Sequence, residues 1–407
     1  MASVYRMKLP VAQMLAVGAA VMTMTALAFF RVPILPAIGD DLHMSTTQLG
    51  LMTTVYAVGR LLMDVPAGIM VDSRPLVMIL RLAGGLIALG SLLLAVAPVA
   101  AVAYLAIFTL GTGTALTNTT GAAYFSTIAP VARRGMSISG FAAFQLGGQA
   151  FGPAVAGVVA GFGSWRSAEV LAVVVGVVVV VGLPAVRFMP ASIERPTGKG
   201  DDSTGTWTVT RLTRVVLFSV PFVLFLTIGS MIQTLVPIIG DEEFGLSVST
   251  IGLAAGLAGF SRFVGAMIAG QVADRVSRKA ALVPGLLLQS VGVVLLGVTS
   301  SGAGWLVSIL ALAVGSVGTS IAIAILADMA TPGTLGRQLG RFRLAGDAGL
   351  IIGPVMTALV YDQFGREAAV LPVAALGAVC AVAVALVVPE TRWGGGARRR
   401  LRPGKVG

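Results

Sequence analysis

The stretch GRLLMDVPAGIMVD at residues 59–72 returns as SRFVGAMIAGQVAD at residues 261–274, and these two related segments decide how the rest of the chain is interpreted. Superposition of the two segments aligns Arg60 with Arg262, Gly68 with Gly270, and Asp72 with Asp274. In a helix, each arginine lies roughly 18 Å from its aspartate, near the middle of a hydrocarbon core about 30 Å thick if the aspartate lies at the water boundary. A charge at that depth costs at least a few kcal/mol, so these arginines are expected to have a functional or structural role.

The composition of the chain indicates a membrane protein. Of its 407 residues, 56% are hydrophobic and only 11% are charged, and the mean hydropathy is +0.94. A soluble domain carries about 25% charged residues, so this chain could not cover a water-exposed surface of its own. The net charge of +11 does not indicate nucleic-acid binding, because 23 of the 28 Lys and Arg residues fall in one alternating set of segments. This positive-inside bias places both termini in the cytoplasm, with the basic tail resting on anionic lipid.

Hydrophobic runs predict twelve membrane spans. Their centres lie near residues 24, 59, 87, 111, 147, 178, 226, 262, 290, 315, 351 and 379. We expect an all-α polytopic fold of four parts: an N-terminal six-helix bundle (1–188), a cytoplasmic linker (189–213), a C-terminal six-helix bundle (214–390) and a basic cytoplasmic tail (391–407). The first apolar run is too long for the core of a signal peptide and is interpreted as a retained span.

The duplication extends through most of the chain and favours transport. Gly152-Pro153 matches Gly353-Pro354, and Arg166 matches Arg366, at nearly the same offset. Two parallel halves that meet at a central site are a recognised transporter design. One cysteine and one histidine cannot form a disulfide framework or a Cys/His metal site, and no nucleotide-binding loop has the required spacing. We therefore expect no enzyme activity, no cofactor and no metal.

The charged residues inside the spans are the first candidates for function. Asp64 follows Arg60 by one helical turn, where the two can form a structural ion pair or a proton-coupling pair. Arg262 has Ala266 at the corresponding place, so its partner must be an acid on another helix, a backbone carbonyl, water or an anionic substrate. Asp347, in the eleventh span, is a possible partner and a second candidate for proton coupling.

Arg31 and several uncharged polar residues complete the predicted substrate cavity. Arg31 lies near the outer end of the first span, where it could instead snorkel toward Asp40 and Asp41. Single polar residues inside spans more often join helices than bind ligands. The candidates are Asn118, Gln145, Gln149, Ser230, Gln233 and Thr319.

The aspartates at the inner ends of the repeated segments predict a gate. A carboxylate just past a span can bind the positive N-terminus of a neighbouring helix, here the helices that begin near Arg341 and Met136. Such a contact would hold the inner side shut and break when that side opens, although ordinary loop chemistry is the alternative. The predicted gating residues are Gly68, Asp72, Arg74, Gly270, Asp274, Arg275, Arg278 and Lys279.

Small residues and proline in the fifth span predict close helix packing. Small residues at four- and five-residue spacing let another helix approach, and proline kinks its helix. The residues concerned are Gly140, Gly148, Gly152, Pro153 and Gly157, with Gly353 and Pro354 in the eleventh span.

Together these features resemble the major facilitator superfamily, and within it the twelve-span drug:proton antiporters. The loop signature of that family is matched by Gly270, Asp274, Arg275, Arg278 and Lys279, and more weakly by Gly68, Asp72 and Arg74. The antiporter pattern of the fifth span is matched by the glycines and proline named above. The family's coupling arginine in the fourth span is absent, because Ile107 stands there. The resemblance implies a monomer in which spans 1, 4, 7 and 10 line a cavity that opens to alternate sides.

We therefore expect a secondary-active transporter in a bacterial cell (inner) membrane, with a small-molecule substrate and protons as its partners. The preferred interpretation is proton-coupled export of an amphipathic or drug-like compound. The alternative is proton-coupled uptake or exchange of a small organic anion held by Arg60 and Arg262. A non-transporting receptor or a lipid-handling protein is the third interpretation.

Overall fold

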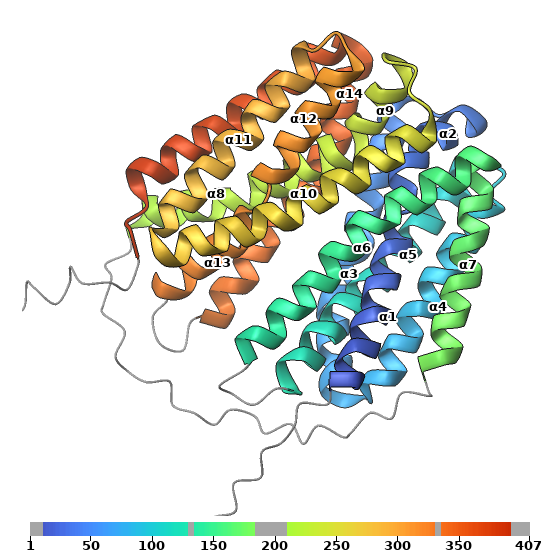
Figure 1. Cartoon of the computed structure of the whole chain (residues 1–407), viewed down its shortest axis with the longest axis horizontal. Helices are drawn as coiled ribbons and strands as arrows, with labels where there is room; N and C mark the ends of the chain where they lie inside the picture. The colour runs from blue at the N-terminus through green and yellow to red at the C-terminus, as the bar shows by residue number, and fades with distance from the viewer. Residues whose placement is uncertain (1–10, 129–133, 184–209, 330–334, 392–407) are drawn as a thin grey trace, which may run out of the picture.

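The computed structural model describes residues 11–128, 134–183, 210–329 and 335–391, and every regular element in these ranges is a helix. The predicted linker and basic tail lie almost entirely outside the described residues. Figure 1 shows the helices in two bundles, one for each half of the chain.

The first bundle consists of seven helices. They are α1 (Val11–Phe29), α2 (Arg31–Leu42), α3 (Thr46–Ser73), α4 (Leu76–Ala95), α5 (Ala100–Thr127), α6 (Arg134–Phe162) and α7 (Trp165–Gly182). Helices α1 and α2 together form the first span, interrupted at Phe30. The Ser45 side chain and Gln48 form a capping box that starts α3, where the chain turns back from the outer end.

The second bundle repeats this arrangement. Its elements are α8 (Arg211–Thr227), the π-helix η3 (Ile228–Leu235), α9 (Val236–Glu242), α10 (Val248–Arg275), α11 (Arg278–Val298), α12 (Gly302–Gly315), α13 (Gly318–Met329) and α14 (Leu335–Val387). Helices α8, η3 and α9 run together as one span, and α12 and α13 as another. Helix α14 contains two arms, because Gly365 has φ 80° and ψ −178° and reverses the chain between them.

The predicted all-helical polytopic fold is confirmed. Ten helical segments of the described chain are long and apolar enough to cross a membrane, and the last of them is α14 with its two arms. Helix α6 adds a further segment of 29 residues. The short turn near Ala97 and Pro98 separates α4 from α5 as expected.

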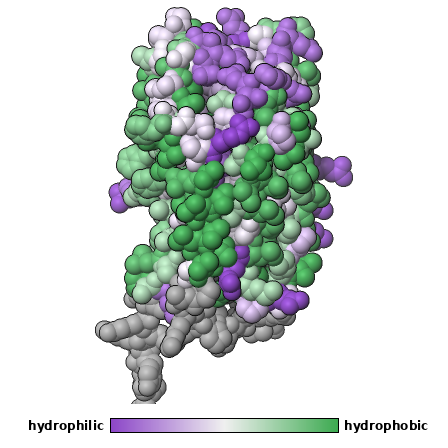
Figure 2. Space-filling model, turned by 90° about the vertical axis from the view of Figure 1, so that its right-hand side faces the viewer, coloured by the Kyte–Doolittle hydropathy of each residue, from purple (hydrophilic) through white to green (hydrophobic). Residues whose placement is uncertain are grey.

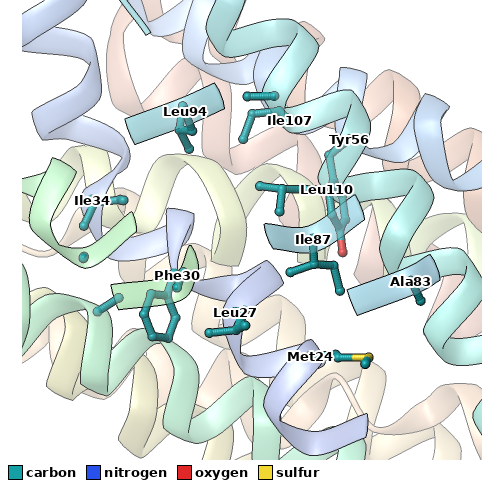
Figure 3. Close-up of a cluster of buried hydrophobic side chains, with 14 of the residues drawn as sticks. Met24, Leu27, Phe30, Ile34, Tyr56, Ala83, Ile87, Leu94, Ile107 and Leu110 are labelled. Atoms are coloured by element: carbon teal, nitrogen blue, oxygen red, sulfur yellow. The ribbon is translucent and has the colours of Figure 1, made fainter. Parts of the chain in front are cut away.

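Each bundle has its own apolar core. Figure 3 shows part of the first core, where Met24 and Leu27 of α1 lie near Ile87 of α4 and Leu110 of α5. The surface is equally apolar: Figure 2 shows a hydrophobic belt, with hydrophilic residues gathered at the outer end. Large apolar side chains such as Leu386, which is 79% exposed, face outward. Such a belt suits the lipid core rather than water.

An equivalent ion pair at the outer end of each bundle supports the duplication. Arg166 pairs with Asp41 in the first half. Its counterpart Arg366 pairs with Glu243 in the second half, at 2.9 Å. Both arginines lie at the start of the last span of their half and reach back to the end of its first span, so the two bundles are built to one plan.

The two bundles touch at the outer end and separate at the inner end. A Cβ atom built on Gly50 of α3 would lie 2.6 Å from the Pro354 carbonyl oxygen of α14, and one on Gly157 of α6 would lie 2.7 Å from the Gly252 Cα atom of α10. Near the inner ends of α3 and α10, a Cβ atom on Gly68 or Gly270 meets nothing within 4 Å. Figure 1 shows the same spreading of the ribbons. The described conformation is closed at the ends predicted to be outer and open at the ends predicted to be inner.

Candidate functional site

A small pocket lies between the bundles where the outer closure ends. Helices α1, α2 and α6 of the first half and η3, α10 and α12 of the second half form its wall. The lining residues are Phe29, Val32, Leu146, Gln149, Pro153, Ile228, Ile232, Gln233, Ala255, Ala258, Gly259, Arg262 and Ala313. Its volume of about 40 Å³ holds only a few water molecules, so a larger ligand requires the bundles to move.

The first span of each half is irregular beside this pocket. In the first half the helix breaks at Phe30, between α1 and α2. In the second half the corresponding stretch winds as the π-helix η3. Short π-helical turns occur mostly at functional sites, because the wider turn redirects side chains and frees backbone groups. Here the irregular stretches supply Phe29, Val32 and Gln233 to the pocket wall.

Arg262 is the charged residue of the pocket wall. It extends from α10 across to α6 of the other half, where its Nη1 atom donates a hydrogen bond of 2.9 Å to Oε1 of Gln149. Among the described residues, no carboxylate oxygen lies within 4.0 Å of its guanidinium group. The prediction that Asp347 pairs with Arg262 is therefore wrong for this conformation. The pocket presents a positive charge that an amide only partly satisfies.

Arg31 lies at the centre of the interface between the halves and is 1% exposed. Its Nη2 atom donates to Oε1 of Gln233 at 2.6 Å, its Nη1 atom donates to Oγ1 of Thr53 at 3.4 Å, and its guanidinium group lies 4.3 Å from the centre of the Tyr56 ring. The expectation that Arg31 snorkels outward is wrong, because these inward contacts hold it. Arg31 is not part of the pocket wall, but it binds Gln233, which is.

Arg60, Asp64 and Asp347 form a looser charged group farther toward the inner side. Asp347 is 7% exposed and interacts electrostatically with Arg60, Asp64 and Arg343. Within the described chain, Arg60 and Asp64 do not come within 4.0 Å of each other, so the predicted ion pair is not formed. The charges of α3 and α14 thus lie near each other at the interface between the halves. None of these residues lines the pocket.

The six uncharged polar candidates divide into two groups. Gln149 and Gln233 line the pocket. Gln145 donates to Asn118 at 2.6 Å and joins α6 to α5 inside the first half. Ser230 donates to the carbonyl oxygen of Leu226, and Thr319 is also outside the pocket wall. Asn118, Gln145, Ser230 and Thr319 do not line this pocket, and a ligand contact for them stays a prediction.

The predicted gating residues lie at the open inner ends. Asp72, Arg74, Asp274 and Arg275 are exposed, and in the described chain neither aspartate binds the opposite half. This placement fits a gate that is open here, and it leaves the gate itself a prediction.

Arg278 and Lys279 differ from these residues, because they bind their own half. Arg278 pairs with Asp328 of α13 at 2.7 Å, and Lys279 donates to the carbonyl oxygen of Ala385 at 2.6 Å. The carboxylate of Glu390 accepts from both backbone N–H groups at the start of α11. Their predicted gating role is therefore not visible in this conformation, and they fasten three spans of the second bundle together.

The small residues of α6 bring it against two different helices. A Cβ atom on Gly148 or Gly152 would lie 2.4 or 2.3 Å from a carbonyl oxygen of α1, and Gly157 faces α10. Pro153, inside the same helix, lines the pocket. Gly140 meets nothing within 4 Å, so close packing is wrong for that residue in this conformation.

In the eleventh span, Gly353 packs against η3 and α8. A Cβ atom built on Gly353 would lie 2.7 Å from the Ser230 hydroxyl oxygen and 2.9 Å from Leu226. Pro354, the next residue, faces Gly50 across the interface between the halves.

One buried charged residue was not recognised from the sequence. Glu169 is 0% exposed and lies on α7, one turn from the outer end of that helix. The available signal was a carboxylate within an apolar run, Val170–Gly182 following directly. Because Glu169 lies close to a loop in the sequence, this signal does not distinguish a buried carboxylate from one at the surface.

The pocket between two equivalent bundles fits a class of protein: a multi-pass membrane transporter with alternating access. A family model described as Major Facilitator Superfamily matches residues 15–242 and 228–403. The chain belongs to this superfamily, and it is a secondary-active transporter rather than an enzyme.

Similar proteins narrow the description further. A hexuronate transporter of Bacillus subtilis (strain 168) is 27% identical over 354 residues, covering 81% of this chain and 83% of that protein. The solved structure of the xylose transporter XylE from E. coli, in an inward open conformation, covers 94% of this chain and 97% of its own, with a TM-score of 0.76 and 13% identity.

A second structure with the same fold is a bacterial homolog to human lysosomal transporter, Spinster, in an inward-facing conformation. It has a TM-score of 0.70 and 17% identity, and covers 95% of this chain and 96% of its own. Both structural likenesses concern the fold. The resemblance to drug:proton antiporters, and with it multidrug efflux, has no support from these comparisons.

Proposed function

We propose that the protein transports a small organic anion of the hexuronate class by alternating access. The observation that carries this proposal is Arg262, a cation in the wall of the central pocket whose only hydrogen bond from the guanidinium group, among the described residues, goes to an amide. A cation at membrane depth without an acidic partner is costly, and an anionic ligand would offset that cost. The similarity to a hexuronate transporter supports the same class of substrate.

The pocket wall contains groups that suit a sugar acid. A guanidinium group binds a carboxylate through two parallel hydrogen bonds, which fixes the orientation of the ligand as well as its charge. The amides of Gln149 and Gln233 can donate to and accept from sugar hydroxyl groups. The remaining wall is apolar, as is usual for a binding site with few orienting groups. Gln149 must then release Arg262 when the carboxylate arrives.

Export of a cationic drug fits this pocket less well. A cationic ligand would need an acidic residue in the wall, and the wall contains Arg262 instead. The candidate acids Asp64 and Asp347 lie outside it. Uptake or exchange of an anion, driven by protons, is therefore the better interpretation. An inward proton gradient sets the direction of transport. Protons that enter together with the anion neutralise its charge and drive its uptake.

Counterflow in proteoliposomes tests the proposal. Protein reconstituted with internal unlabelled D-glucuronate or D-galacturonate should accumulate the radiolabelled anion, and neutral glucose should not compete. Arg262→Gln should abolish counterflow of the anion, and Arg262→Lys should retain part of it, because lysine keeps the charge but not the paired hydrogen bonds. Arg81→Gln, which removes an exposed arginine near the start of α4, is the control and should transport normally. Equal transport of glucose, or full activity of Arg262→Gln, would exclude the proposal.

A further inference from the structure

Glu169 is the most fully enclosed acidic group of the described chain, and the proposed binding site does not use it. Its side chain is 0% exposed. Neither carboxylate oxygen has a hydrogen bond of good geometry among the described residues, although the Ser91 hydroxyl of α4 lies beside it. The Ser91 Oγ atom is likewise buried without a well-formed hydrogen bond. The site therefore offers a carboxyl group little stabilisation in its ionised form.

The charged surroundings of Glu169 are simple. Arg31 on α2 is the charged residue that interacts with it electrostatically, yet the two do not form an ion pair within 4.0 Å in the described structure. The neighbouring helix α1 has no charged residue, α4 has only Arg81 near its inner end, and α6 has only Arg134 at its inner end. On α7 itself, Arg166 is held by Asp41 at the surface.

Arg31 connects Glu169 to the pocket. The Nε atom of Arg31 is buried without a partner, while its two terminal nitrogens bind Thr53 and Gln233. Gln233 lines the pocket that contains Arg262. A change of charge on Glu169 therefore acts first on Arg31, and through Arg31 on an amide that the ligand would contact.

An ionised and a neutral Glu169 favour different positions of Arg31. An ionised carboxylate attracts the guanidinium group, whose free Nε atom offers it a donor, and so competes with Gln233. A neutral carboxylic acid leaves Arg31 to bind Gln233, as in this structure. An ionised carboxylate that is buried without hydrogen-bond donors is costly. The ionised and neutral forms of Glu169 therefore differ in free energy as well as in the contact that Arg31 makes.

Glu169 also lies where a proton can arrive from outside. It follows the first residue of α7, Trp165, by one turn, roughly 6 Å along the helix axis. The Arg166–Asp41 pair closes the surface next to this turn, and Arg166 also donates to the carbonyl oxygen of Ala97.

We propose that Glu169 is a proton-binding site of the transport cycle and that it acts on the substrate pocket through Arg31 and Gln233. The proposal rests on the proposed transport of an organic anion and deepens it by naming a coupling group. Glu169 binds one proton from the outside, which frees Arg31 for the interface; the anion then binds, and both leave on the inside. The cycle moves one proton with one anion charge. Glu169 is a positioning residue, since it does not line the pocket.

Infrared difference spectroscopy tests the proton site without any substrate. Purified protein in lipid, exchanged between alkaline and acidic buffer, should show the carbonyl band of a newly protonated buried carboxylic acid. Glu169→Gln should lose this band, and Glu367→Gln, which removes an exposed acid of the outer surface, should retain it. An unchanged band in Glu169→Gln would overturn the assignment, even if no transported anion had been found.

Proteoliposomes test the link to transport. With radiolabelled D-glucuronate, Glu169→Gln should retain counterflow but lose accumulation driven by an inward proton gradient, down to the level without a gradient. Glu169→Asp, which restores a carboxyl group, should recover part of the gradient-driven accumulation and shift its pH profile. Full gradient-driven accumulation by Glu169→Gln would overturn the coupling role. Failure of the wild-type protein to exchange the anion would instead remove the proposed function and leave the infrared result standing.

Discussion

Arg31 donates a hydrogen bond of 2.6 Å to Gln233, and this bond joins the first span of one half to the first span of the other. Because both residues belong to the first span of their half, the bond can persist only while the outer ends are together. It is one contact of a two-state interface.

Gln233→Leu should loosen the outer closure. The change removes the acceptor of the Arg31 Nη2 atom with little change in volume, and loss of a buried hydrogen bond to a charged group costs about 1.5–3 kcal/mol. In a Cys380→Ser background, a cysteine at Ala154, which contacts Gly256 in the closed interface, should react faster with a membrane-impermeant maleimide. Gln145→Leu is the control, because Gln145 binds Asn118 within one bundle. Equal labelling rates in the two variants would contradict the role of the Arg31–Gln233 bond.

Gly157→Val should hold the outer end open. A Cβ atom at this position already lies 2.7 Å from the Gly252 Cα atom and 2.7 Å from the Val248 carbonyl oxygen, so α6 and α10 would have to separate. Overpacking of this kind costs about 1–3 kcal/mol, which is enough to shift an equilibrium between two conformations. Distances between spin labels on the outer ends of α6 and α10 should increase, and transport should fall.

The matched control for this substitution lies on the same helix. Gly140→Val introduces the same side chain where a Cβ atom meets nothing within 4 Å. Its outer-end distances should therefore match those of the wild-type protein. Shortened or unchanged distances in Gly157→Val would show that the glycine contact does not set the outer closure.

The fold could be predicted from the sequence because its signals are local and repeated. A span needs about twenty apolar residues, and the duplication supplied an independent check on each span. The position of Arg262 in a central pocket followed from the same reasoning, since a charge at mid-membrane depth points inward. The break of α14 at Gly365 likewise agrees with a turn between two predicted spans.

The contacts of the charged residues could not be predicted in this way. Asp64 follows Arg60 by one turn, yet in the described chain the two stay more than 4.0 Å apart, while Arg60 also acts on Asp347 of the other bundle. The hydrophobic pattern of the sequence indicates how deep a residue lies in the membrane and on which face of its helix. The bundle that the residue faces depends on how two helices cross. The sequence likewise leaves open whether Arg31 faces the cavity or the outer surface, because its partner Gln233 belongs to the other half.

Asp362→Ala should weaken the outer closure from a different point. Asp362, on α14, accepts hydrogen bonds from the backbone N–H (2.7 Å) and the hydroxyl group (2.5 Å) of Thr47, at the N-terminus of α3 in the other half. Loss of a carboxylate that caps a helix costs about 1 kcal/mol. Labelling of a cysteine at Ala154 should again accelerate, but less than in Gln233→Leu, because the Asp362 contact is exposed to water. Glu367→Ala, an exposed acid without an interaction across the halves in the described structure, serves as the control.

The ion pair between Arg278 and Asp328 should stabilise the second bundle without any counterpart in the first. Positions 202 residues earlier hold Leu76 and Ser126, which cannot form such a pair. The pair spans 2.7 Å, and its side chains are 24% and 21% exposed, so water screens it only in part. In a double-mutant cycle of Arg278→Ala and Asp328→Ala, measured by thermal unfolding in detergent, the coupling free energy should be about 1 kcal/mol.

The outer pair of Arg166 and Asp41 provides the comparison for that cycle. Its side chains are 37% and 44% exposed, so its coupling free energy should be smaller, at about 0.5 kcal/mol or less. Equal coupling in the two cycles would show that burial does not govern these pairs. Glu390 also holds this end of the bundle, because it accepts hydrogen bonds from the first two N–H groups of α11 at 3.1 and 3.2 Å. A coupling free energy near zero for Arg278 and Asp328 would assign the stability of the inner end to these backbone contacts instead.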